Sequence, residues 1–504
     1  MIFWRVKPLD KILETAEKKS LKRQLGPIQL TLLGIGAVIG TGIFVLTAEA
    51  GQKAGPGMMI AFVIAAIVCG LAALAYAELA SMIPVSGSAY TYSYGVFGEF
   101  VAWIVGWALG LEYGIGAATV CVGWSGYMNG LLKNATLFGM VQPGALALPR
   151  FLADGVPGGG AFNLLAFLIA LAVTWLLVVG TSKSARVNAV LVAIKIVTLT
   201  AFIILALPTV KSSNFEPFLP TGWYGSGGGV GVLGAAASIF FAYVGFDAVS
   251  TAAEETKNPN RNVPIGLIGS LVICTIFYLL TGYAAAGSVG AQPVMGPDGL
   301  AIDPSSPAMA AACEHMSALV CSKEPLAYVL QQIGFPYVGN LLRVAVGFAL
   351  PSVILMMMFG QTRIFFTMSR DGLLPDALSK VHPRFFTPHV ITILTGITVA
   401  LFSSQLPVGQ LADTSNSGTL LAFAMVSIGV LILRKTQPNR PRPFRTPAAW
   451  IVCPLAAIGC VVLFWNLSPF AKLFFVGWAA IGLVLYGLYG YKRSHLANGT
   501  ESPN

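Results

Sequence analysis

The chain has 504 residues, of which 56% are hydrophobic and only 10% charged, and its mean hydropathy is +0.77. This composition excludes an ordinary soluble protein and a disordered one. The formal net charge of +10 would suit nucleic acid, but the basic residues follow the loops of a membrane protein, so we predict a lipid bilayer as surroundings and no nucleic-acid partner.

Twelve apolar segments are long enough for membrane helices, which need about 20 residues each. In chain order they lie at roughly 29–47, 57–82, 98–131, 161–180, 186–207, 231–253, 264–288, 338–362, 388–405, 411–433, 448–467 and 470–490. They leave no stretch long enough for a soluble domain. The sequence therefore predicts one all-α polytopic membrane domain with twelve transmembrane helices.

Lysine and arginine are distributed unequally between the two sides of this predicted bundle. If the N-terminus lies inside, most of them fall in the N-terminal segment, in alternate loops and in the C-terminal tail. The outer side then holds only Lys53, Lys133, Arg150, Lys211, Lys323 and Lys472. Because basic loops stay in the cytoplasm, we predict that both termini are cytoplasmic. Residues 1–28 mix charged with apolar side chains, which predicts an amphipathic helix on the inner membrane surface.

The first predicted span contains Gly34, Gly36, Gly40 and Gly42. Each glycine destabilises a helix by about 1 kcal/mol relative to alanine, and backbone groups freed in hydrocarbon need other partners. We therefore predict a helix that is broken at Gly40, Thr41 and Gly42. The N–H groups there would begin the outer half-helix, and a helix N-terminus suits a carboxylate. Alternatively, the glycines serve only close helix packing.

Residues 84–95 separate the second and third spans and are small, polar and aromatic, without Lys or Arg. We predict a short re-entrant or surface helix there. The third span carries Glu112 and Tyr113 deep in apolar sequence. Glu112 would either line a cavity or brace a neighbouring helix, and we keep Glu112, Tyr113 and Asp247 as candidate cavity or gate residues.

Lys195 lies about halfway along the fifth span. Ten residues at about 1.5 Å each place it some 15 Å from the membrane entry, too deep for comfortable snorkelling. Inserting a lysine at that depth costs about 2.5–3.5 kcal/mol, so it is a candidate for proton exchange. The alternative is a fixed charge paired with an acid such as Glu112 or Asp247.

The sixth span is interrupted at 240–247, where a glycine is followed closely by Asp247. Interrupted spans one and six occupy corresponding positions if two five-helix halves repeat with inverted topology, the arrangement typical of secondary transporters. Carbonyl groups near Phe241, Ala242 and Val244 would suit an ammonium. A carboxylate receiver beside an ammonium receiver predicts a site for an α-amino acid.

Cys313 and Cys321 share the long outer loop 289–337, where an oxidising compartment would permit a disulfide. The sequence leaves open whether it forms. The chain has no CxxC pattern and no histidine cluster, so we predict no metal and no cofactor other than a coupling proton. A nucleophile elbow, a phosphate loop and a catalytic dyad are also missing, which argues against an enzyme. Three adjacent methionines, Met356, Met357 and Met358, are more often packing residues than ligand contacts, but methionine adapts its shape and could set the width of a pocket.

Six motifs together resemble the bacterial members of the cationic amino acid transporter family, within the amino acid–polyamine–organocation superfamily. The resemblance spans roughly residues 25–435, and the motifs are Gly36–Phe44, Pro84–Tyr90, Phe240–Asp247, Glu254–Pro259, Gly360–Arg363 and Met368–Pro375. It implies a five-plus-five inverted repeat of the LeuT-like fold, with helices 1 and 6 broken and two further C-terminal helices. The parts would be the N-terminal segment 1–28, a ten-helix transporter core 29–435, two additional helices 436–491 and a cytoplasmic tail 492–504.

The resemblance also implies particular site residues. The predicted substrate contacts are Val38, Ile39, Gly40, Thr41, Gly42, Phe241, Ala242 and Val244, with Met357 narrowing the pocket. Lys195 would occupy the place of the sodium ion of sodium-coupled relatives, which implies proton coupling.

We therefore predict an amino acid:proton symporter that works by alternating access in a bacterial inner membrane. An amino acid or polyamine antiporter and a non-transporting amino acid sensor are the alternatives. The amino acid and the bilayer are the predicted partners, and a small membrane-protein partner is left open. The family name suggests arginine and lysine, yet bacterial relatives often prefer neutral amino acids, so the substrate stays open between small neutral and cationic.

Overall fold

The computed structural model describes residues 5–6, 25–84, 88–134, 144, 146–180, 185–225, 229–253 and 256–498. The predicted N-terminal helix, residues 254–255 of one motif and the end of the tail lie outside these ranges. The described residues form helices and no β-strand beyond isolated bridges. Seven helical segments are long and apolar enough to cross a membrane, and five shorter apolar helices accompany them. The protein is therefore an all-helical, multi-pass membrane protein.

The first half of the chain follows the predicted order, with the first span split into three pieces. Its helices are α2 (Pro27–Val38), α3 (Thr41–Phe44), α4 (Leu46–Ala54), α5 (Met58–Met82), α6 (Ser88–Val96), α7 (Glu99–Asn134), α8 (Arg150–Ala153), α9 (Leu164–Val179) and α10 (Ala185–Ala206). The short helix α6 confirms the helix predicted between the second and third spans. The end predicted for the first span, residue 47, is wrong, because α4 continues to Ala54.

The second half begins with the interrupted sixth span. Its helices are α11 (Gly231–Ile239), η6 (Phe240–Tyr243), α12 (Ala248–Thr251), α13 (Pro259–Val289), α14 (Pro307–Ala312), α15 (Pro325–Gln332), α16 (Pro336–Arg370), α17 (His389–Gln405), α18 (Val408–Thr436), α19 (Ala449–Trp465), α20 (Pro469–Leu485), α21 (Tyr491–Arg493) and α22 (His495–Asn498). Each predicted apolar segment coincides with one or more of these helices.

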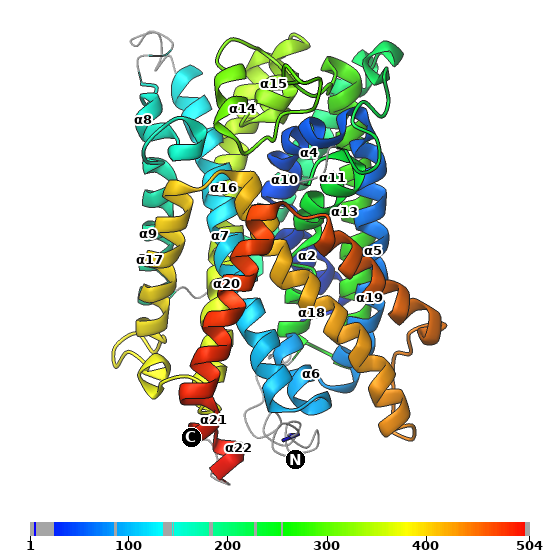
Figure 1. Ribbon diagram of the computed structural model, residues 1–504, viewed down its shortest axis with the longest axis vertical. Helices are drawn as coiled ribbons and strands as arrows, with labels where there is room; N and C mark the ends of the chain where they lie inside the picture. The colour runs from blue at the N-terminus through cyan, green and yellow to red at the C-terminus, as the bar shows by residue number, and fades with distance from the viewer. Residues whose placement is uncertain are drawn as a thin grey trace.

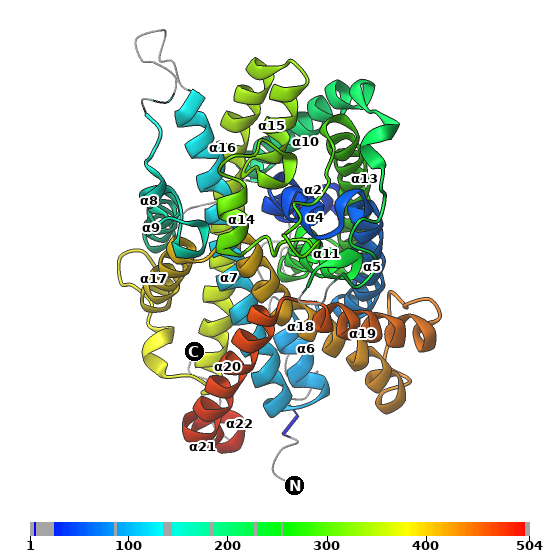
Figure 2. The ribbon, with the colours of Figure 1, turned by 45° about the horizontal axis from the view of Figure 1, so that its top comes forward.

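The long helices run roughly along one axis of the molecule, and both chain ends lie at the end opposite α14 and α15 (Figure 1). Glu99 at the start of α7 joins the two end segments, because its N–H donates to the Arg5 carbonyl and its carboxylate accepts from the Ser494 hydroxyl. Arg5 and Ser494 therefore lie at the same end of α7. Turned so that the end with α14 and α15 comes forward, the molecule shows α15 beside α16 (Figure 2).

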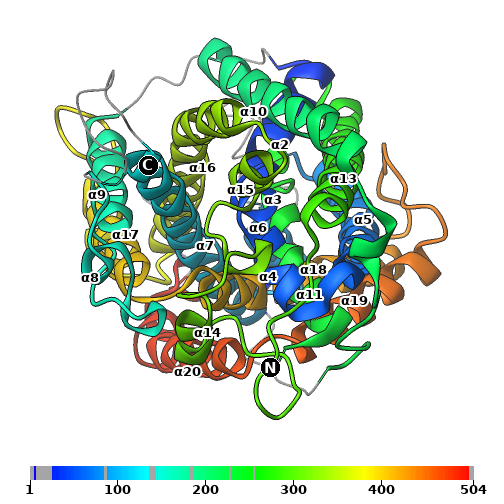
Figure 3. The same cartoon turned by 90° about the horizontal axis from the view of Figure 1, so that it is seen from above.

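Seen from above, α10, α13, α5, α19, α20 and α17 surround α2, α3, α11 and α18 (Figure 3). The peripheral helices carry many of the exposed apolar side chains, such as Val197 on α10 and Val461 on α19, which are 66% and 60% exposed. The inner helices bury theirs. This distribution is what a bilayer requires, since lipid tails solvate the outer surface.

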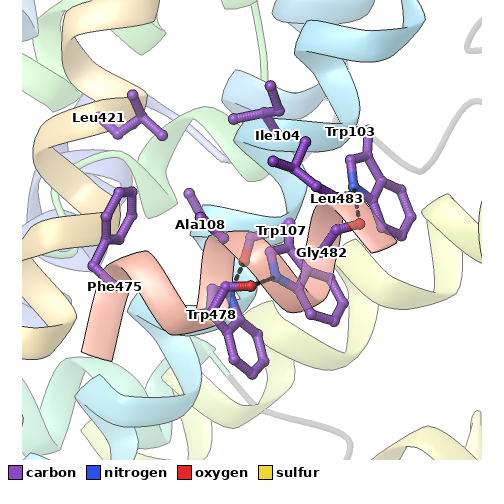
Figure 4. A pocket seen from close by; sticks show the side chains of 10 residues that line it. Trp103, Ile104, Trp107, Ala108, Leu421, Phe475, Trp478, Gly482 and Leu483 are labelled. Atoms are coloured by element: carbon purple, nitrogen blue, oxygen red, sulfur yellow. Dashed lines mark hydrogen bonds between the residues drawn. The ribbon is translucent and has the colours of Figure 1, made fainter. Parts of the chain in front are cut away.

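Tryptophan side chains join α20, in the twelfth predicted span, to α7, in the third (Figure 4). Trp107 of α7 and Trp478 of α20 each donate an indole N–H to the other's carbonyl, at 2.8 and 2.9 Å, and their rings stack 4.4 Å apart. Trp103 donates to the Gly482 carbonyl at 3.0 Å. They line a cavity of about 80 Å³ whose walls are almost entirely apolar. These contacts hold α20 against the bundle, and this cavity is too small and apolar for an amino acid.

The outer loop after α13 forms a cap that is fixed to the outer half of the first span. Cys313 and Cys321 form a disulfide within it, which settles the question that the sequence left open. Gln52 of α4 is fully buried and donates to the carbonyls of Val294 and Ile302, while its own carbonyl accepts from the Val294 N–H. The cap therefore covers α4 directly.

Candidate functional site

The first span is broken at the predicted position. Helix α2 ends at Val38, and Ile39 and Gly40 adopt extended or irregular backbone angles before α3 begins at Thr41. Among the described residues, the N–H groups of Thr41 and Gly42 have no hydrogen-bond acceptor. The Thr41 hydroxyl is buried and also has no partner there. These buried donors are free to bind an anionic group.

The sixth span is interrupted as predicted, and its break packs directly on the first. Helix α11 passes into the single turn η6, and Val244 is extended before Gly245, whose φ of +110° suits glycine. A Cβ atom added to Gly42 would lie only 2.2 Å from Cα of Ala242. The two breaks are thus in backbone contact. Close packing, which the sequence offered as an alternative reason for the glycines, applies at Gly42.

Tyr278 of α13 bridges the two breaks, and the sequence reasoning missed it. Its buried hydroxyl lies 2.8 Å from the Val38 carbonyl and 2.8 Å from the Ala242 carbonyl. One hydroxyl has one hydrogen, so the two carbonyls share it. A tyrosine within an apolar span gives no signal in the sequence, because only the fold shows where its hydroxyl points.

Lys195 of α10 reaches the carbonyl end of α2. Its ammonium Nζ lies 2.6 Å from the Gly36 carbonyl oxygen, and the side chain is 1% exposed. No carboxylate of the described residues lies within ion-pair distance of it, so the alternative of a pair with Glu112 or Asp247 is not what the structure has. Lys195 and Tyr278 instead hold two neighbouring carbonyls of the broken span.

The candidate cavity or gate residues Glu112, Tyr113 and Asp247 differ in their hydrogen bonds. The Tyr113 hydroxyl donates to Asp247 Oδ2 at 2.7 Å and so links α7 to the second break. Glu112 is fully buried, and neither carboxylate oxygen has a hydrogen-bond partner among the described residues. Its carbonyl accepts from the Ser415 hydroxyl of α18. Glu112 therefore has no ion-pair partner among the described residues, while Asp247 braces two helices.

Met357 of α16 lies where three helices meet. A Cβ atom at Gly116 of α7 would be 3.0 Å from its sulfur and 3.1 Å from the Ser415 hydroxyl of α18. The methionine is 5% exposed. Met357 therefore fills space between α7 and α18, and its predicted role in narrowing the pocket stays a prediction.

A buried ionic cluster on α4 was also missed, because the sequence assigned Lys53 to an outer loop. Lys53 lies within α4 and is 3% exposed. Its ammonium is 3.2 Å from Asp413 Oδ2, 3.5 Å from Glu49 Oε1 and 2.5 Å from the Ser238 hydroxyl. Ser238 also donates to Asp413. The cluster joins α4, α11 and α18, that is, the outer halves of both broken spans to the tenth.

Replacing Lys53 with methionine should lower the thermal unfolding temperature sharply. The variant would leave Glu49 and Asp413 buried without a cation, and breaking such a pair costs roughly 3–5 kcal/mol. Thermal unfolding of the purified protein would measure the loss. Lys211→Met, at an exposed lysine of the outer loop, is the control and should unfold like the parent. Equal unfolding temperatures for both variants would contradict a stabilising role.

With this geometry in place, comparisons with known proteins identify the family. A family model described as "Amino acid permease" matches residues 25–488. The chain belongs to the amino acid permease family. This permease is therefore a membrane transporter and not an enzyme.

Individual relatives agree with this assignment. The permease is 44% identical over 489 residues to the branched-chain amino acid permease BcaP of Bacillus subtilis, covering 97% of both chains. It is 39% identical over 497 residues to the methylthioribose transporter of the same organism, covering 98% of this chain and 99% of the relative. The vacuolar cationic amino acid transporter 4 of Arabidopsis thaliana is 34% identical over 83% of this chain and 64% of its own length. The predicted resemblance to the cationic amino acid transporters is confirmed.

Proposed function

We propose that the permease is a secondary active transporter that takes up neutral amino acids together with protons, by alternating access across a bacterial inner membrane. The observation that carries this proposal is the contact between the two broken spans, where free N–H groups at Thr41 and Gly42 lie beside the carbonyl-rich turn at Ala242. An α-carboxylate would bind the former and an α-ammonium the latter.

Within this proposal the substrate contacts are Val38, Ile39, Gly40, Thr41, Gly42, Phe241, Ala242 and Val244. Tyr278 already uses the Val38 and Ala242 carbonyls. A substrate ammonium would have to share these oxygens with the tyrosine. Sharing is possible because each carbonyl oxygen has two lone pairs. The hydrogen bonds of the Tyr278 hydroxyl would therefore change when substrate binds.

Proton coupling is proposed to act through Lys195. When protonated, its ammonium binds the Gly36 carbonyl and holds the inner half of the first span, as a bound cation would. When the proton leaves, that contact weakens and α2 can move. At the proposed outer side, the buried Lys53 cluster would hold the broken spans in a similar way, because it joins the outer halves of both spans to α18.

The proposed topology has twelve membrane helices, with a five-plus-five inverted repeat in the core at 29–435 and two added helices at 436–491. The contacts of Glu99 with both end segments support an even number of crossings. The unequal distribution of lysine and arginine supports cytoplasmic termini.

Uptake into proteoliposomes is the direct test of symport. Labelled alanine or valine should accumulate when an inward pH gradient is imposed, and accumulation should stop when an ionophore dissipates the gradient. Uptake that requires internal amino acid and ignores the pH gradient would instead establish exchange. Binding without any flux would leave the sensor alternative.

We expect neutral amino acids to compete for the site at least about ten-fold better than arginine, a difference of about 1.4 kcal/mol. A guanidinium at this site would need a buried acid, and Asp247 already accepts from Tyr113. Competition against labelled alanine by valine, leucine, arginine and methylthioribose would measure the order. If arginine wins, neutral selectivity is wrong and the buried Glu112 becomes the residue that recognises it. If methylthioribose wins, the amino acid assignment of the site is wrong.

A further inference from the structure

A groove of about 650 Å³ lies beside the first turns of α13, away from the two breaks. Its walls are Pro264, Ile265 and Ile268 of α13 and, across the opening, Pro443 and Phe444 from the segment between α18 and α19. Its polar end carries Asn260 and Arg261. The groove is thus apolar along its length and cationic at one end.

The far wall of this groove is held firmly in place. The Phe444 N–H donates to the Ser81 hydroxyl at the end of α5, at 3.3 Å. Two residues later, the Thr446 N–H donates to Glu78 Oε2 at 2.8 Å. The groove therefore has a fixed shape on the side opposite α13.

Among the residues that the structure describes, no acid neutralises the positive charge at the polar end. Arg261 and Arg445 are exposed, and neither forms an ion pair with any described residue. Glu78, which the far wall of the groove contacts, is already bound by Arg434 and Arg442. A ligand with a negative group would therefore be attracted to Arg261.

The apolar wall continues beyond the groove as an exposed stripe on α13. Ile265, Val272 and Ile276 are 42%, 52% and 54% exposed. From Arg261 to Ile276 the helix rises about 22 Å, more than half of the roughly 30 Å hydrocarbon core. A cation followed by such a stripe matches a molecule with an anionic head and a long apolar tail.

We propose that this groove binds one anionic phospholipid of the cytoplasmic leaflet, with its phosphate on Arg261 and an acyl chain along the exposed face of α13. The assignment to the cytoplasmic leaflet rests on the proposed topology. The lipid site itself rests on the groove and on Arg261, whichever side of the membrane they face. Basic pockets between membrane helices on the cytoplasmic side recognise such headgroups by the same charge attraction.

The bound lipid would act on the transport cycle through α2. Gly269 lines the groove and also faces Thr31 of α2, since a Cβ atom there would lie 3.4 Å from the Thr31 hydroxyl. At Gly266 a Cβ atom would lie 2.8 Å from Leu30. The lipid therefore braces the helix against which the inner half of the first span packs.

Native mass spectrometry of the purified full chain, titrated with phosphatidylglycerol or phosphatidylcholine, tests the site without requiring transport. Phosphatidylglycerol should bind the parent about five-fold more tightly, the effect expected for one basic side chain. Arg261→Gln should remove this preference, Arg261→Lys should retain most of it, and Ile265→Trp should weaken both lipids by filling the groove. Lys380→Gln, at an exposed cation outside the groove, is the matched control and should leave the preference unchanged.

Several outcomes would overturn the proposal. Equal binding of the two lipids by the parent would do so, as would a preference that survives Arg261→Gln. Tight binding of glycerol 3-phosphate alone would show that the apolar wall plays no part. Uptake in liposomes with and without phosphatidylglycerol then measures the effect on transport separately, so a failure of symport cannot be mistaken for a failure of the lipid site.

Discussion

Replacing Lys195 with alanine is expected to abolish amino acid accumulation driven by a pH gradient. The ammonium is 2.6 Å from the Gly36 carbonyl and has no acidic partner among the described residues, so its removal leaves that end of α2 without the cation that holds it. Arginine at this position should also transport poorly, because a guanidinium keeps its proton. Uptake into proteoliposomes measured against external pH would check both variants.

Tyr278→Phe is the matched control for this experiment. It removes the hydroxyl that the Val38 carbonyl of the first break and the Ala242 carbonyl of the second share, but leaves the lysine intact. Uptake should slow while its dependence on the pH gradient is retained. If Lys195→Ala still accumulates substrate with the pH profile of the parent, Lys195 is structural and the proton must use another group.

The sequence was sufficient for the features that composition and glycine placement encode. Hydropathy located the apolar helices. Dense glycines placed the break in the first span, because backbone groups freed in hydrocarbon must find partners in the protein or in a cavity. One glycine followed closely by Asp247 placed the break in the sixth span. The depth of Lys195 in its span made it a candidate functional residue, and the structure puts its ammonium at the Gly36 carbonyl, near the end of α2.

The contacts missed from the sequence depend on helix packing. Lys53 looked like an ordinary basic loop residue because the span was predicted to end at residue 47, yet α4 continues and carries it to Asp413, 360 positions later in the chain. Tyr278 and Ser238 are inconspicuous in apolar sequence, and only the juxtaposition of α13 and α11 with the first break gives their hydroxyls a role. The sequence around a residue does not reveal a side-chain partner that lies hundreds of positions away in the chain.

Substituting Gly42 with alanine should abolish substrate binding even though the change adds one methyl group. The new Cβ would lie 2.2 Å from Cα and 2.4 Å from Cβ of Ala242, so the two breaks would have to separate by about 1 Å. Such overpacking costs typically about 1–3 kcal/mol, and the separation would pull the N–H groups at the first break away from the carbonyls of the second. An α-amino acid that bridges both breaks would then lose its hydrogen bonds to one of them. Equilibrium binding of labelled substrate to the purified variant would measure the loss.

Gly40→Ala separates this steric effect from a general intolerance of side chains at the break. A Cβ atom at Gly40 would meet only Val353, at 3.4 Å, an ordinary contact. Gly40 also has a negative φ of −149°, so an alanine there is not forced into the left-handed region. The two glycines stand two positions apart in the same break, yet only one of them touches the other broken span. Binding should therefore survive at position 40 and fail at position 42. Loss at both positions would mean that the glycines act through backbone flexibility, and retention at both would place the substrate elsewhere.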